Sequence, residues 1–354
     1  MDCLFDGNKP HLAMWTWLYD VENSWRRYYQ FGSPAELGAV PLYYTVLCGF
    51  HDLAGRLLNS RPQDVNAWGG YPTYWTPLHA AVIKEHLNMA ILLLECGAHV
   101  DSCRGQHYTA LYVASSRGNA MVVQLLINHG ADMNVECDDK DDNIDNVKWT
   151  PLLVASEKGR PENASVLLEH STCANHQDTD GKSPLHYASC HLSADLVWLL
   201  LDNGANPAAL DVWGNTALHE ASYHGRVAVV MLLLKYGANV NPWSNSGHTP
   251  LHDTVRQEHL EVVQLLLSCG ANMSAHTKYR WTALHQAAFK GSIPIVDFLL
   301  KCGTDLHART DQGKTPFQLA SEKDYLQMMW LLSEWTGECK EDLEMWDQPA
   351  RMWV

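Results

Sequence analysis

The chain has 354 residues and a formal net charge of −15 at pH 7, from 40 acidic and 25 basic residues. This balance argues against nucleic acid or an anionic membrane as the main partner, because both bind clustered Lys and Arg. It fits a soluble protein, it favours a protein partner with a basic patch, and it leaves the oligomeric state open.

Residues 1–39 come first along the chain, and they predict a helical head rich in aromatic side chains. Leu18, Val21, Trp25 and Tyr28 have the spacing of one helix face. Alone, such a helix would expose a large apolar surface. We therefore expect the head to cap the segment that follows it, with docking onto a separate partner domain as the alternative.

From residue 40 to residue 335 a six-residue phrase recurs, as in TPLHDT at Thr249, mostly at intervals of 33 residues. Thr suits a helix N-cap, and Pro suits the first helical position because its missing N–H costs nothing there. An apolar stretch follows, and a Gly such as Gly270 then suits the left-handed end of a second helix. Each unit therefore predicts two short helices that need their neighbours to bury an apolar face. The phrases start near residues 40, 76, 109, 150, 183, 216, 249, 282 and 315.

The phrase and its period resemble the ankyrin repeat family. The resemblance implies an all-α solenoid of about nine helix–turn–helix units with β-hairpin-like fingers, which binds protein partners rather than catalysing a reaction. It also implies that the histidine of the phrase bonds within its turn and to the next repeat. These structural histidines are His79, His186, His219, His252 and His285.

No motif for catalysis or for a cofactor occurs in the sequence. GxSxG, the kinase HRD and DFG motifs and the phosphate-binding GxxxxGK[ST] loop are missing, so we expect no enzyme activity and no cofactor. HExxH and a Cys/His cluster with zinc spacing are missing too, so we assign no metal ligands. The ten cysteines include no CxxC pair, and Cys96, Cys269 and Cys302 share one repeat position, too far apart to bridge. We expect reduced packing cysteines in an intracellular protein, most simply cytoplasmic, with the nucleus as an alternative.

An acidic insertion, Glu136 to Asp145, lengthens one interval to 41 residues. Asp139, Asp141 and Asn143 match the first calcium ligands of an EF-hand, but Ile144 and Thr150 occupy the positions that need Gly and Glu. A solvated, mobile loop is the simpler interpretation, and a contact for a basic partner is the other. Its role is left open.

Aromatic residues at variable repeat positions are the strongest indication of a binding surface, since Trp and Tyr are enriched at binding hot spots. On fingers we place Tyr108, Trp149, Trp213, Tyr279 and Trp281; on first helices facing a concave groove we place Tyr187, Tyr223, His224 and Phe289.

Two individual repeats contain further features. Ser171 replaces the helix-ending Gly in the repeat whose second helix should begin at Pro161, which predicts a local weak point. The final unit carries Lys323, Asp324 and Glu334, which we expect to give its second helix a polar capping surface. An acidic and aromatic tail, 336–354, follows.

A closer resemblance covers roughly residues 4–80. The segments Leu4 to Asp6, Lys9 to His11, Trp15 to Asp20, Pro41 to Tyr44 and Cys48 to Leu53 resemble the junction before the ankyrin arrays of fungal NACHT-type NTPases. No nucleotide-binding segment precedes the junction here, so we expect a detached sensor half, a gene fragment or a free-standing array without NTPase activity. The alternative function is a regulatory or inhibitory subunit of an enzyme, recruited through the head or the tail.

Overall fold

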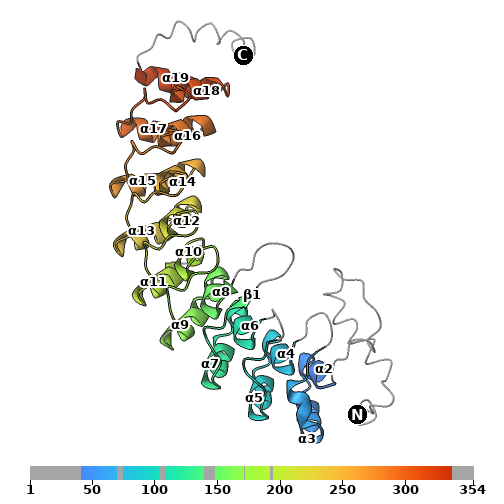
Figure 1. Ribbon diagram of the computed structural model, residues 1–354. Helices are drawn as coiled ribbons and strands as arrows, with labels where there is room; N and C mark the ends of the chain where they lie inside the picture. Colours follow the sequence, from blue (N-terminus) through green and yellow to red (C-terminus); the bar gives the residue numbers. More distant parts are fainter. Residues whose placement is uncertain are drawn as a thin grey trace. The chain divides into compact units, whose positions relative to one another are not determined.

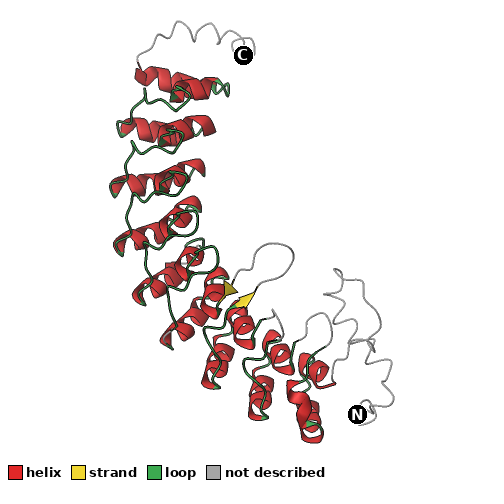
Figure 2. Ribbon diagram, in the orientation of Figure 1, coloured by secondary structure: helices red, strands yellow, loops and turns green. Residues whose placement is uncertain are grey.

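The computed structural model describes residues 41–69, 75–103, 108–138, 148–170, 172–191 and 194–336. These residues form eighteen α-helices, one 3-10 helix and one small two-stranded sheet (Figures 1 and 2). The chain divides between Cys173 and Ala174 into two compact units. The predicted head, 1–39, and the predicted tail beyond Thr336 lie outside the described residues, as does Ser171.

The first unit contains four helix pairs. Helices α2, α4, α6 and α8 pack consecutively in one row, and α3, α5, α7 and α9 pack in a second row. The bounds are α2 Pro41–Leu47, α3 His51–Ser60, a 3-10 helix Pro62–Asn66, α4 Pro77–Ile83, α5 Leu87–Glu95, α6 Ala110–Arg117, α7 Ala120–Asn128, β1 Cys137–Asp138, β2 Lys148–Trp149, α8 Pro151–Glu157 and α9 Pro161–Glu169.

The second unit contains five pairs in the same arrangement (Figure 1). Its first helices α10, α12, α14, α16 and α18 form one row, and its second helices α11, α13, α15, α17 and α19 form the other. The bounds are α10 Pro184–Ala188, α11 Ala194–Asp202, α12 Ala217–Tyr223, α13 Val227–Lys235, α14 Pro250–Arg256, α15 Leu260–Ser268, α16 Ala283–Lys290, α17 Ile293–Lys301, α18 Pro316–Ser321 and α19 Leu326–Thr336.

The six-residue phrase of each repeat explains where its helix pair begins and what the pair buries. Thr249 is the N-cap of α14 with extended backbone, and Pro250 occupies its first turn. Leu251 of the first helix and Leu266 of the second are almost fully buried between the rows. Because the same residue types recur in every repeat, one apolar seam runs through each unit. The expectation of an all-α solenoid of helix pairs is confirmed.

Glycine ends the second helices in the conformation that the sequence predicts. Gly204, Gly237 and Gly270 have φ of +81°, +86° and +89°. Pro161, in contrast, does not weaken its repeat, because it lies in the first turn of α9, which has nine residues like α11. The predicted weak point therefore rests on Ser171 alone.

If the backbone at position 171 is left-handed, as the repeat position predicts, Ser171→Gly should raise the free energy of unfolding by about 1 kcal/mol, because a side chain in that conformation has a steric cost that glycine avoids. Urea denaturation followed by circular dichroism measures this change. The reciprocal variant Gly204→Ser, at a position with φ +81°, should lose a similar amount. A destabilising Ser171→Gly would show that this repeat ends its helix in another conformation.

Two antiparallel residue pairs join the start of the insertion to the residues just before Thr150. Cys137 pairs with Trp149 and Asp138 with Lys148, and the Lys148 ammonium lies 2.8 Å from the Glu136 carboxylate. Asp139, Asp141 and Asn143, the proposed calcium ligands, lie outside the described residues.

We expect deletion of Asp138 to Asp145 to leave the helical circular dichroism signal and the melting temperature nearly unchanged. Shortening a loop by this much changes its closure entropy by less than ~1 kcal/mol, and α7 and α8 keep their packing. A large loss of helicity would show that the insertion is structural. A calcium-dependent rise in the melting temperature of the intact chain would restore the ion-site hypothesis.

Two expectations about side chains are wrong. Lys323 and Asp324 precede α19 instead of lying on it, because the turn ends with Asp324 at φ +57°. Glu334 does lie on α19 and is exposed, as expected, next to the exposed apolar side chains of Leu326, Trp330 and Trp335.

Cys96, Cys269 and Cys302 are exposed instead of packed, because each is the C-cap that follows the last residue of a second helix. Among the described helices none is both long and apolar enough to cross a membrane.

Candidate partner-binding surface

The histidine of the phrase holds the next finger in place. The Thr249 backbone N–H donates to His252 Nδ1 at 3.2 Å, so Nε2 carries the proton and donates to the Trp281 carbonyl at 3.1 Å. Equivalent bonds join His79 to Tyr108, His186 to Asn215, His219 to His248 and His285 to Lys314. Each of these five side chains thus bonds within its own turn and to the next repeat.

Burial favours the neutral form of four of these imidazoles. It lowers the pKa of His219 and of His252 to about 4, and it lowers the pKa of His186 and of His285 as well. A neutral ring can accept at one nitrogen and donate at the other, which the two bonds require.

The fingers of the second unit are tied to one another through the backbone. Asn245 N–H donates to the Trp213 carbonyl at 2.8 Å, and Asp311 N–H donates to the Tyr279 carbonyl at 3.1 Å. With their main chains fixed, the side chains of Trp213 and Tyr279 remain 51% and 67% exposed. Large aromatic groups are thereby presented to solvent on a rigid support.

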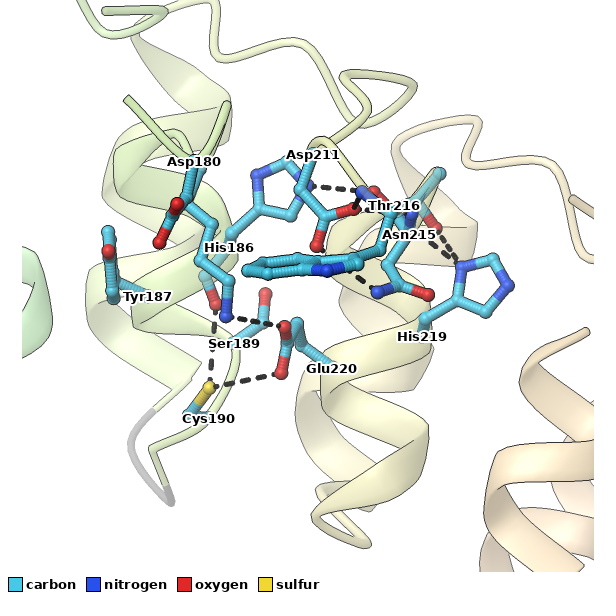
Figure 3. Close-up of polar contacts among 12 residues, drawn as sticks. Asp180, His186, Tyr187, Ser189, Cys190, Asp211, Asn215, Thr216, His219 and Glu220 are labelled. Atoms are coloured by element: carbon cyan, nitrogen blue, oxygen red, sulfur yellow. Dashed lines mark hydrogen bonds and ion pairs between the residues drawn. The ribbon is translucent and has the colours of Figure 1, made fainter. Parts of the chain in front are cut away.

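Lys182 organises the first aromatic group. Its ammonium lies 5.7 Å from the ring centres of both Tyr187 and Trp213 and 3.0 Å from a Glu220 carboxylate oxygen. The Tyr187 hydroxyl donates to Asp178. Figure 3 shows Tyr187 of α10 and Glu220 of α12 on neighbouring first helices. Finger and first-helix side chains therefore form one surface in these repeats.

The next repeats continue this surface. Tyr223, at the end of α12, is 38% exposed and lies 5.1 Å from the His224 ring, with the Arg256 guanidinium 5.4 Å from its own ring centre. Trp281 is half-buried and packs edge-on against Phe289 at 5.4 Å. We call the residues Tyr187, Trp213, Tyr223, His224, Tyr279, Trp281 and Phe289 the aromatic surface.

The remaining two predicted residues belong to the first unit. Tyr108 is half-buried and stacks on Tyr112 of α6 with ring centres 4.2 Å apart. Trp149 lies in β2 and is also half-buried. Both contribute to the packing of the first unit, and neither is as exposed as Trp213.

Sequence reasoning missed three exposed apolar residues on the same fingers. Leu210, Val212 and Trp243 are each at least 51% exposed, and the Trp243 ring lies 6.3 Å from that of His276. Leu210 and Trp243 occupy one repeat position, 33 residues apart. That shared position is the signal that could have identified them.

Within the described residues, Cys190, Glu220 and His224 bring three metal-ligand side chains together, with donor atoms no more than 4.8 Å apart. The sequence analysis assigned no metal ligands, because these residues come from two repeats and match no contiguous motif.

Comparison with known proteins agrees with this architecture. The family model for ankyrin repeats in three copies matches residues 42–137, 136–211, 195–277 and 259–342. A 94-residue stretch is 33% identical to the ankyrin repeat protein nuc-2 of Neurospora crassa, covering 27% of this chain and 9% of that protein. A 93-residue stretch is 33% identical to the mouse ankyrin repeat and SAM domain-containing protein 6, covering 26% of this chain and 10% of that protein. The matches span about a tenth of each relative.

Proposed function

The chain belongs to the ankyrin-repeat family, whose repeats are protein–protein interaction modules, and we propose that it binds a protein partner through its aromatic surface. The observation that carries this proposal is the exposure of Trp213, Tyr223, Tyr279 and Phe289, which lie on fingers and first helices of the second unit. Exposed aromatic side chains on a rigid support bury a large area at little cost in conformational entropy.

The rigid backbone of these fingers supports the proposal further. A partner that docks there does not have to order the loops first, so less of its binding energy is lost. Ankyrin-repeat proteins are typically interaction scaffolds, and non-covalent recognition is the mechanism that this surface can perform.

Alanine variants test the aromatic surface. After proximity labelling has identified a partner, we expect Trp213→Ala and Tyr223→Ala each to weaken its affinity by about 2 kcal/mol or more, roughly 30-fold. Trp198→Ala is the matched control, because Trp198 is 48% exposed but lies on the second helix α11. Unchanged affinity in both test variants, or an equal loss in the control, would reject the assignment.

The net charge suggests the chemistry of the partner. With a formal charge of −15, the chain attracts a partner that has a basic patch, and association should slow as ionic strength rises. Nucleic acid is not the proposed ligand. A salt titration of the association rate checks this part of the proposal.

Two more specific functions are compatible with protein binding and follow from the sequence analysis. One is the sensor half of a fungal NACHT-like system, in which the array would recognise a ligand. The other is a regulatory or inhibitory subunit recruited through the head or the tail. The exposed apolar side chains of Leu326, Trp330 and Trp335, on the helix that precedes the tail in sequence, favour this role. A pull-down that compares the full chain with chains lacking 1–39 or 337–354 distinguishes them, since only the second role requires a terminal segment.

A further inference from the structure

We propose that Cys190, Glu220 and His224 bind a zinc ion. Their sulfur, carboxylate oxygen and imidazole nitrogen all lie within 4.8 Å of one another, and all three side chains belong to the second unit. Thiolate, carboxylate and imidazole are the three protein ligand types of zinc. This site is separate in its chemistry from the partner binding proposed above and needs no partner to be observed.

The repeat architecture builds the cluster. Glu220 lies on α12 and His224 is its C-cap, four residues apart, so both side chains lie on one face of the helix. Cys190 follows α10, the first helix of the preceding repeat, which packs against α12. The Arg226 guanidinium donates to the Cys190 carbonyl at 2.7 Å and fixes the backbone at that point.

The distance between two of the ligand atoms already suits a shared zinc ion. Cys190 Sγ lies 3.6 Å from Glu220 Oε2. On a tetrahedral zinc ion with ordinary Zn–S and Zn–O bond lengths, the sulfur and oxygen would lie about 3.6 Å apart. The His224 imidazole, which is partly exposed, lies with its donor nitrogen within 4.8 Å of both atoms and completes the set of three donors.

Lys182 orients the carboxylate from outside the cluster. Its ammonium binds Glu220 Oε1 at 3.0 Å, which leaves Oε2 directed at Cys190 (Figure 3). Outer-shell bonds of this kind fix metal-ligating carboxylates in known sites. Lys182 also contacts Trp213, and His224 belongs to both groups, so the cluster adjoins the aromatic surface and shares this residue with it.

Binding must displace the thiol proton. In the free chain the Cys190 Sγ lies 3.6 Å from both the Glu220 carboxylate and the His186 carbonyl, and burial raises the pKa of this thiol to about 12. When zinc binds, the S–H proton leaves for solvent, one proton per ion, and the sulfur lone pair forms the Zn–S bond. Thiolate and carboxylate together neutralise the dication, while Lys182, Arg226 and His259 are the neighbouring cationic or titratable groups. Three protein ligands leave the fourth position for water or for a side chain of a partner.

The experiment uses the untagged, metal-free full chain and measures binding by calorimetry with Zn²⁺ and by absorption with Co²⁺. We expect one equivalent to bind, one proton to be released in buffers of different ionisation enthalpy, and cobalt to show a thiolate charge-transfer band. Cys190→Ser should abolish that band, and Glu220→Gln and His224→Gln should each weaken binding at least 10-fold. Lys182→Met should weaken metal binding less, because it removes only the bond that orients the Glu220 carboxylate.

Cys269→Ser is the matched control, since Cys269 is an exposed cysteine outside the cluster. Melting curves of all variants without metal identify any that fail to fold. Binding that persists unchanged in Cys190→Ser, a cobalt band lost in Cys269→Ser, or no binding by the intact chain would each overturn the proposal.

Discussion

Acidification from pH 7 to pH 5 should cost the Asp253→Asn chain about 4 kcal/mol of unfolding free energy, and the unaltered chain less. The largest contributions come from His219 and His252, whose pKa values are lowered to about 4 by burial. In the unfolded chain both histidines titrate near 6.5. Below that pH the unfolded state binds more protons than the folded state, so stability falls until the pH reaches the folded pKa.

Asp253 acts in the opposite direction. Its pKa is raised to about 7, mainly by burial. Between pH 7 and its unfolded value near 4 the folded state therefore binds the extra proton, and stability rises as the pH falls, by about 2 kcal/mol at pH 5. Asp253→Asn removes this gain and leaves the histidine loss unopposed. Urea denaturation at both pH values measures the difference.

The last repeat shows a natural replacement of the phrase histidine that keeps the helix cap but does not titrate. In the last repeat Gln318 replaces the histidine and still accepts from the Thr315 backbone N–H, at 3.0 Å. His219→Gln together with His252→Gln should therefore keep both caps and remove most of the acid sensitivity. If the double variant loses as much stability at pH 5 as the unaltered chain, these histidines are not the cause.

Asn163→Ala should lower the unfolding free energy by about 2–4 kcal/mol, because it removes two buried hydrogen bonds to backbone carbonyls and leaves a cavity. Asn163 lies on α9 and is fully buried. Its amide nitrogen donates to the Ala114 carbonyl at 3.0 Å and to the Ser115 carbonyl at 2.9 Å, at the end of α6. The side chain thereby joins a second helix to the first helix of the preceding repeat.

Comparison with Asn163→Leu separates the effect of the lost hydrogen bonds from the effect of the lost packing. Aliphatic residues such as Leu196, Val229 and Val262 occupy the same repeat position elsewhere, so leucine restores apolar burial without the hydrogen bonds. We expect Asn163→Leu to lose stability, but less than Asn163→Ala. If leucine raises stability above that of the unaltered chain, the two bonds contribute no net stabilisation. Urea denaturation followed by circular dichroism measures both variants.

The sequence by itself determined the repeat register and the order of the helices. Thr, Pro and Gly act on the backbone within one turn, so Thr249, Pro250 and Gly270 predict where helices begin and end without knowledge of any distant contact. The apolar period likewise predicts which face each helix buries, as Leu251 and Leu266 do. All of this information is local, and it repeats nine times along the chain.

Only the tertiary structure decided which side chains meet across repeats. Trp213 and Trp281 looked equivalent in the sequence, but Trp281 packs against Phe289 while Trp213 stays 51% exposed. Cys190 and Glu220 are 30 residues apart, and their contact depends on the stacking of α10 on α12. Exposure and proximity depend on the packing of neighbouring repeats, and a motif within one repeat carries no information about that packing.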